Sequence, residues 1–268
     1  MPIKNVVVNC TDVQRSVEYY ARFLELEVVG APTAERAVLD AVTATIELRA
    51  VGNGRDHTTW SPDDLQKGFR HLGFKVDRLD ERADVLKAGG VEFKLDPLDA
   101  EGAVRICFFY DPDGTLLEMI QGDLQYAEVL DADGVANERA LGVPQRPRFD
   151  HIAVTIEDRE STSAFYDRNY GFSFIGTIEQ PHDDRGFHIG YLEGGDTVLE
   201  VFTYEVAKSE RAPQLDVAGF AYAELAGDPP DLPVQNAPDG TKVYVDPDGF
   251  PFSVSDGSVG SGSVGSEA

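Results

Sequence analysis

Histidine and glutamate recur at matching positions along this 268-residue chain. His71 and His151 lie in the strand-like segments GFRHLGFKV and DHIAVTIED, and each is followed by a strand-like segment that carries a glutamate, Glu118 or Glu200. Imidazole nitrogens and carboxylate oxygens that converge from different strands bind divalent ions well and leave positions open for a substrate. We therefore predict a site for one divalent transition metal, with Mn, Ni, Co, Zn and Fe as candidates.

The elements that must position these residues form an internal repeat. Residues 68–121 have the pattern strand, helix, strand, strand, strand, and the first strand carries Leu72, Phe74 and Val76 on one apolar face. The pattern places His71 on the opposite face, together with Phe69. One such unit is too small to bury both faces of its sheet, so further copies are expected to complete it.

Three further copies can be aligned with this unit, although the fourth is degenerate and has DPPDLPVQN in place of its helix. Aligning the first strands gives a column of four residues: Asn5, His71, His151 and Ala218. Aligning the last strands gives a second column: Glu47, Glu118, Glu200 and Ser253. The sequence thus predicts an α+β fold of four βαβββ-type modules that form two curved mixed-sheet half-barrels.

These columns, together with the DPDG turn at residues 111–114, resemble the vicinal oxygen chelate superfamily. That superfamily includes glyoxalase I, methylmalonyl-CoA epimerase, fosfomycin-resistance transferases, extradiol dioxygenases and the metal-free bleomycin-resistance proteins. The resemblance extends from Ile3 to Ser255 and is specific for the fold rather than for one reaction.

The resemblance implies a divalent-metal-dependent, glyoxalase-like isomerase, epimerase or lyase that acts on a small oxygenated substrate through a metal-stabilised enediolate. Glu118 or Glu200 would remove the proton, and the other would remain a ligand. One alternative is an Fe(II) extradiol-type dioxygenase that uses His71, His151 and one glutamate. Another is a metal-free protein that binds or sequesters a small molecule.

The set of ligands depends on which modules share a sheet. Crossed pairing, as in two-domain glyoxalases, would join modules two and three and gather a His2Glu2 set, namely His71, Glu118, His151 and Glu200. Modules one and four would then hold the remaining column residues, including Ala218. Neighbour pairing, as in extradiol dioxygenases, would instead join Glu47 and Asn5 to His71 and Glu118. We favour the crossed arrangement because it collects all the lost ligands in one place.

Composition limits the partners and the location of the protein. The net charge is −25, from 48 acidic and 23 basic residues, which argues against nucleic acid and anionic membranes as partners. No stretch is apolar enough to span a membrane, and the N-terminal MPIKNVVV is typical of a strand rather than a signal peptide. We expect a cytoplasmic monomer or homodimer with a small-molecule substrate, and two buried thiols at Cys10 and Cys107.

The repeat also suggests the division into domains. The first domain comprises residues 1–123, with modules at 1–51 and 68–123, and a linker follows at 124–148. The second comprises residues 149–256, with modules at 149–206 and 215–256, and residues 257–268 form a Gly/Ser-rich tail that we expect to be disordered. The shape of the substrate pocket should come from three loops: 52–67, 96–104 and 180–187.

Several other residues are weaker candidates for the site. His57 and His182 lie in polar loops, where solvated side chains are expected, and His188 could either line a pocket or face water. Three more residues could contact a substrate, although the first is better explained as a core residue: Tyr110, Arg105 and Trp60.

Overall fold

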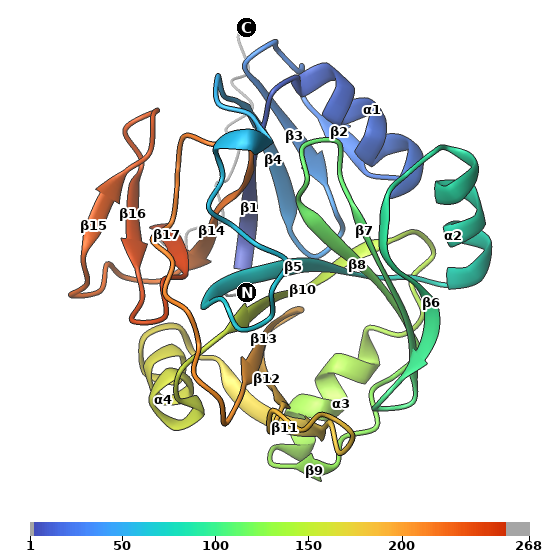
Figure 1. Ribbon diagram of the computed structural model, residues 1–268, viewed down its shortest axis with the longest axis vertical. Coiled ribbons are helices and arrows are strands. Elements are labelled where there is room, and N and C mark those ends of the chain that lie inside the picture. Colours follow the sequence, from blue (N-terminus) through green and yellow to red (C-terminus); the bar gives the residue numbers. More distant parts are fainter. Residues whose placement is uncertain (1–2, 256–268) are drawn as a thin grey trace, which may run out of the picture.

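The structure, a computed structural model, describes residues 3–255, and within them two mixed β-sheets are flanked by four α-helices (Figure 1). The predicted tail at residues 257–268 lies outside the described residues. The helices are α1 (Val13–Phe23), α2 (Leu79–Ala88), α3 (Ala132–Ala140) and α4 (Arg159–Tyr170), and a 3-10 turn, η1, spans Arg55–His57. No helix in residues 3–255 is both long and apolar enough to cross a membrane.

Each sheet combines one module from each half of the sequence. The eight-stranded sheet has the order β15 (Val234–Asn236), β16 (Lys242–Val245), β17 (Pro251–Ser255), β14 (Gly219–Ala226), β1 (Ile3–Cys10), β4 (Thr45–Ala50), β3 (Arg36–Asp40) and β2 (Glu27–Val29). The nine-stranded sheet has the order β6 (Phe93–Ala100), β7 (Val104–Tyr110), β8 (Leu116–Gln121), β5 (Gly68–Lys75), β10 (Arg148–Thr155), β13 (Thr197–Thr203), β12 (His188–Gly194), β11 (Ser173–Glu179) and β9 (Glu128–Val129). The predicted α+β fold of four modules is therefore confirmed, and neither sheet closes into a barrel.

The sheet orders also confirm the crossed pairing of modules. In Figure 1 the first and last quarters of the chain lie together, and the two middle quarters form the other sheet. The junctions are antiparallel pairs between first strands, β1 with β14 and β5 with β10. The strand β5 lies between β8 and β10 in the interior of the nine-stranded sheet, and all eight of its residues are buried. Neighbour pairing of modules one and two is thus ruled out.

The two DPDG turns hold a helix of one module against the end of the next. In the first turn the Asp111 carboxylate accepts hydrogen bonds from the backbone N–H groups of Asp113 and Thr115, at 2.9 and 2.7 Å, and from the Tyr20 hydroxyl of α1. Gly114 supplies the positive φ of 90° that such a turn requires. Asp246 repeats these contacts in the second turn, where the hydroxyl of Tyr166 on α4 donates to it at 2.8 Å.

Two β-bulges in the central pair alter the predicted facing of side chains. His71 pairs with Ala153 but Phe69 pairs with Val154, so Arg70 is an extra residue in β5. The prediction that Phe69 shares a face with His71 is therefore wrong, because the bulge reverses the alternation at that point. A second bulge, in β10, makes Asp150 the extra residue beside His151.

In the fourth module, the residue that corresponds to His71 lies four positions after the predicted one. In the central pairs of the two sheets, Tyr222 of β14 lies opposite Val7 of β1, as His71 lies opposite Ala153. Tyr222, and not Ala218, is therefore the counterpart of His71. The shared Gly-Phe pair at the start of β5 and β14 was the sequence signal for this alignment.

Candidate metal centre

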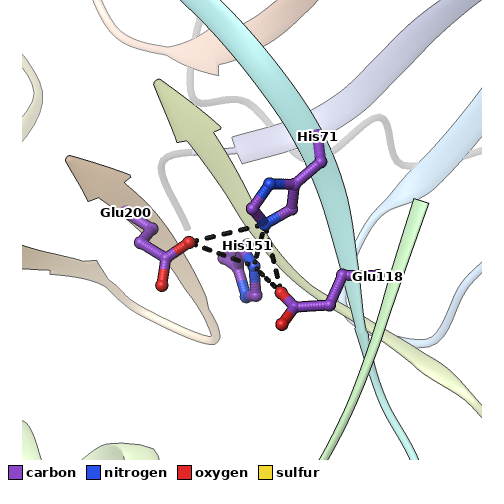
Figure 2. Close-up of side chains that lie close together, drawn as sticks. All are labelled: His71, Glu118, His151 and Glu200. Atoms are coloured by element: carbon purple, nitrogen blue, oxygen red, sulfur yellow. Dashed lines mark hydrogen bonds and ion pairs between the residues drawn. The ribbon is translucent and has the colours of Figure 1, made fainter. Parts of the chain in front are cut away.

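Four strands of the nine-stranded sheet bring two histidines and two glutamates together (Figure 2). His71 lies on β5, Glu118 on β8, His151 on β10 and Glu200 on β13. All four residues are buried, with exposed fractions between 2% and 6%. Their side chains point toward one another, and one ligand atom from each lies within 4.8 Å of all the others.

The spacing of these atoms suits a common divalent ion. His71 Nε2 lies 3.1 Å from His151 Nε2 and 3.1 Å from Glu118 Oε2, and His151 Nε2 lies 2.9 Å from the same Glu118 oxygen. Glu200 Oε2 lies slightly farther from the two imidazole nitrogens, at 3.4 and 3.6 Å. Ligands about 2.1 Å from one ion are separated by about 3.0 Å at right angles and by about 3.4 Å at the tetrahedral angle. The donor set fits Mn, Fe, Co, Ni or Zn.

Asp150 orients the His151 ring from behind. The β10 bulge places the Asp150 carboxylate 3.0 Å from His151 Nδ1, on the side of the ring opposite to the cluster. When Nδ1 donates its proton to this carboxylate, the lone pair of Nε2 faces the other ligand atoms. Sequence analysis did not single out Asp150, because its position directly before a column histidine is informative only once the bulge is known.

The electrostatics of the cluster follow from burial opposed by close charges. Burial favours the protonated form of Glu118, but hydrogen bonds from His151 and His71 outweigh it and lower its pKa to about 2. Burial alone would lower the pKa of His151. The negative charge of Glu200 and the hydrogen bonds to Asp150 and Glu118 instead raise that pKa well above its usual value. The two buried carboxylates thus stabilise positive charge at this centre.

We expect the Asp150→Asn substitution to weaken metal binding by about 10- to 100-fold, which is typical for the loss of a carboxylate that orients a ligand histidine. The amide can still accept a hydrogen bond from Nδ1, but it carries no charge to raise the basicity of the imidazole. Competition with a metallochromic chelator measures the affinity. Asp184→Asn, at an exposed loop position, is the control, and equal affinities in both variants would contradict the orienting role.

Gly73 makes room for the His151 imidazole. It lies opposite His151 in the β5–β10 pair and opposite Glu118 in the β5–β8 pair. A Cβ atom built on Gly73 would lie 2.1 Å from His151 Cε1 and 2.2 Å from Nε2, so any side chain there would collide with the ring. The position thus requires glycine for space rather than for its backbone angles.

The Gly73→Ala substitution should therefore displace the His151 ring and weaken metal binding by at least about 10-fold, because a ligand must be held to about 0.5 Å. Gly52→Ala is a matched control, since nothing lies within 4 Å of a Cβ built there. Isothermal titration with Zn²⁺ and Mn²⁺ provides the measurement. An unchanged affinity in Gly73→Ala would show that His151 is not needed in its present position.

The cluster lies at the wall of a cavity of about 470 Å³. His71, Glu118 and Glu200 line it, and apolar side chains form most of the remaining surface. Among these, Phe108 packs edge-on against the His71 ring, with ring centres 5.0 Å apart. Residues from all three segments predicted to shape the pocket contribute to the lining: Asp64, Leu98, Asp99, Ala100, Glu101, Val104, Gln180 and Phe187. The prediction of a loop at 96–104 is wrong in part, because residues 96–100 belong to β6.

The corresponding position in the eight-stranded sheet holds a different set. There Glu47 accepts hydrogen bonds from Arg36, at 2.7 and 2.9 Å, and from Arg49 at 2.5 Å, and Asn5 Nδ2 lies 3.4 Å away. These guanidinium groups outweigh burial and lower the pKa of Glu47. Cations of the protein thus neutralise the glutamate, and Tyr222 stands where the other sheet has His71. This result agrees with the expectation that one site has lost its ligands.

The weaker candidates lie away from the cluster. His57, His182 and His188 are all exposed, which settles the open question for His188 in favour of water. Arg105 forms ion pairs with Asp80 and Asp99 on the surface, at 2.6 and 3.0 Å. Two others, Trp60 and Tyr110, line a separate cavity. The two thiols are free and buried, as predicted for Cys10 and Cys107.

Comparison with known proteins finds a match between part of the chain and a described family. Residues 3–119 match the model of the Glyoxalase/Bleomycin resistance protein/Dioxygenase superfamily. A lactoylglutathione lyase of Schizosaccharomyces pombe is 27% identical over 117 residues, which are 44% of this chain and 34% of that protein. The uncharacterized protein YwkD of Bacillus subtilis is 26% identical over 129 residues, covering 44% of this chain and 95% of that protein.

Similarity to solved structures extends over nearly the whole chain. Glyoxalase I from Zea mays superimposes on 95% of this chain and 92% of its own, with a TM-score of 0.64. The sequence identity is 19%, so this similarity concerns the fold. The match to the yeast lyase, in contrast, spans only about a third of that protein's length.

Proposed function

Because this chain carries a domain of the glyoxalase/bleomycin resistance/dioxygenase superfamily, we propose that it is a divalent-metal-dependent enzyme that moves a proton on a small oxygenated substrate. The observation that carries the proposal is the convergence of His71, Glu118, His151 and Glu200 at the wall of a largely apolar cavity. The reaction is an isomerisation, an epimerisation or an elimination. We further propose that the enzyme is cytoplasmic and acts on a small molecule.

The four residues of the cluster would hold the ion. A divalent ion supplies Lewis-acid polarisation of neighbouring substrate oxygens, which makes an adjacent C–H bond more acidic. The apolar walls, including Phe108 and Phe202, which both pack near the His71 ring, exclude water and strengthen the electrostatic interactions inside the cavity.

We assign the role of general base to Glu200. Its Oε2 lies 3.4 and 3.6 Å from the two imidazole nitrogens, whereas Glu118 Oε2 lies 3.1 and 2.9 Å from them. Glu118 is therefore the more tightly held carboxylate, and Glu200 is the freer one. Tyr191, opposite Glu200 in the β12–β13 pair, forms a side-chain hydrogen bond with it.

In this scheme the Glu200 carboxylate takes a proton from a substrate carbon beside a carbonyl group. Returning the proton to the neighbouring carbon gives an isomer, and delivery of a solvent proton to the opposite face of the original carbon gives an epimer. If a leaving group departs from the adjacent carbon instead, the electron pair of the broken C–H bond forms a double bond.

The test is proton exchange with solvent. Protein loaded separately with Mn²⁺, Ni²⁺, Co²⁺, Zn²⁺ or Fe²⁺ is incubated in D2O with α-hydroxycarbonyl compounds, and loss of the C–H signal is followed by NMR. Lactoylglutathione belongs in the panel because the S. pombe relative is named as its lyase. Exchange that requires both the metal and Glu200 supports the proposal, whereas no exchange with any compound or metal counts against it.

A second candidate is Fe(II) extradiol-type oxygen chemistry, favoured by one observation. His71, His151 and Glu118 have ligand atoms within 3.1 Å of one another, which is the donor set of a 2-His-1-carboxylate site. Anaerobic loading with Fe²⁺, followed by measurement of oxygen uptake with catechols, tests it. No uptake would remove this candidate.

A further inference from the structure

A second cavity, of about 320 Å³, lies at the boundary between the two sheets. Its walls come from the connection between β4 and β5, the connection between β13 and β14, the starts of β5 and β14, and the first DPDG turn. It shares no lining residue with the metal cavity. The bulge at Arg70 lies between the two cavities: Phe69 lines this second cavity, whereas Arg70 and His71 line the metal cavity.

Hydrogen bonds between the two connections make this cavity a built feature. The Gln214 side chain accepts from the Thr59 N–H at 2.7 Å and donates to the carbonyl of His57 at 3.2 Å. The Ala218 N–H donates to the carbonyl of Asn53 at 2.9 Å, close to one end of the cavity. These hydrogen bonds join two wall segments that are more than 150 residues apart in the sequence.

Arg211 is a cation in this wall without a protein counter-charge. Its Nε is buried and has no hydrogen-bond partner among residues 3–255. Burial, and then the like charge of Arg70, lower its pKa to about 10, so the guanidinium remains charged near neutrality. Within the same described residues no carboxylate forms an ion pair with it. A charged group placed in this way is costly unless a ligand neutralises it.

The other charged groups of the lining do not neutralise Arg211. The Asp113 carboxylate is occupied by Arg15 at 2.6 Å and by the Thr11 hydroxyl at 2.7 Å. Arg55 adds a second guanidinium to the wall, held loosely 3.7 Å from the exposed Glu92 and stacked over the Tyr110 ring at 5.3 Å. The exposed Asp56 also lines the cavity, so the lining holds two guanidinium groups and two carboxylates. Among the described residues, neither carboxylate forms an ion pair with Arg211, which leaves this guanidinium available to an anionic ligand.

The remaining surface is suited to a ring. Phe69 and Phe220 stack in parallel with ring centres 4.0 Å apart, and Trp60 is tilted against Phe69 at 6.5 Å. All three line the cavity together with Tyr110. Aromatic side chains beside a guanidinium fork form a surface for a planar or cyclic apolar body that carries an acid group.

We propose that this cavity binds a carboxylate carried on an aromatic or alicyclic ring, with the carboxylate on Arg211 and the ring against Trp60, Phe69 and Phe220. The site is independent of the metal centre and of the reaction proposed for it. An Arg–carboxylate pair in a partly desolvated cavity supplies the specificity, and the aromatic wall supplies most of the contact area.

Trp60, the single tryptophan of the chain, reports occupancy directly. Titration with cyclohexanecarboxylate or benzoate should give a saturable change in tryptophan fluorescence, with a dissociation constant on the order of 1 mM or lower. Cyclohexylmethanol and benzyl alcohol, which have the same rings without the acid, should bind at least about 10-fold more weakly. Equal binding of acids and alcohols would overturn the proposal.

Variants separate this site from the metal centre and from an effect on folding. Arg211→Gln should weaken binding of both acids by at least about 10-fold without lowering Tm, because its Nε has no hydrogen-bond partner among residues 3–255. Arg159→Gln, which removes a guanidinium that stacks over Phe174 elsewhere, is the matched control and should leave binding unchanged. His71→Ala, which removes a metal ligand, should also retain binding. Undiminished binding in Arg211→Gln, or its loss in His71→Ala, would overturn the proposal.

Discussion

The substitutions His71→Ala and His151→Ala should each abolish the binding of one transition-metal ion per chain. Each removes one of the two imidazoles in a cluster whose ligand atoms all lie within 4.8 Å of one another. Since loss of an orienting carboxylate alone costs about 10- to 100-fold in affinity, loss of a ligand should cost more than about 100-fold. Elemental analysis of purified protein, followed by titration with Zn²⁺ and Mn²⁺, measures the effect.

Two controls make this result specific. His188→Ala removes an exposed histidine from β12 of the same sheet and should leave metal content unchanged. Glu47→Gln changes the glutamate at the corresponding position of the other sheet, where Arg36 and Arg49 neutralise it, and should also retain the ion. Metal loss in Glu47→Gln with retention in His151→Ala would contradict the crossed site. Failure of every form to bind a metal would favour a metal-free binding protein.

Much of this cluster could be predicted from sequence because two periodic signals agree. Alternation in β5 defines the apolar residues Leu72 and Phe74, and the internal repeat places His71 and His151 at equivalent points of their strands. The argument that the lost ligands should collect in one place then favoured crossed pairing. The sheet orders confirm that pairing.

What could not be predicted depends on single extra residues. A bulge shifts alternation by one position without any change in composition, so neither Arg70 nor Asp150 was recognisable as a residue inserted in its strand. The consequences are large for function. One bulge sends Phe69 to the second cavity, and the other brings the Asp150 carboxylate to within 3.0 Å of the His151 ring.

The linker at residues 124–148 also contains more structure than its composition indicated. The helix α3 occupies Ala132–Ala140 within it. In addition, β9 pairs with β11 at the edge of the nine-stranded sheet. A strand of two residues has no detectable alternation, and its pairing is decided by the neighbouring edge rather than by its own sequence.

Replacement of Glu200 by glutamine should reduce proton exchange by about 10²- to 10⁴-fold, the usual contribution of a general base. The amide is nearly isosteric and cannot accept the proton. Because Glu118 and both imidazoles remain, the ion should stay bound with an affinity within about 10-fold of the wild type. Glu118→Gln is expected to act differently, since it removes the carboxylate whose oxygen lies closest to both imidazoles, and should lose the ion.

Measuring metal content and exchange rate on the same samples separates the roles of the two carboxylates. Glu193→Gln, at a buried glutamate on β12 outside the lining of the metal cavity, is the control for loss of a buried charge and should affect neither quantity. If Glu118→Gln keeps the ion but loses exchange, and Glu200→Gln loses the ion, the two roles are reversed. If the Glu200→Gln variant binds its ion and exchanges protons at the wild-type rate, Glu200 is not the general base. Its longer distances from the imidazole nitrogens and its contact with Tyr191 would then be unrelated to proton transfer. The proton would then have to be taken by Glu118 or by a group outside the cluster.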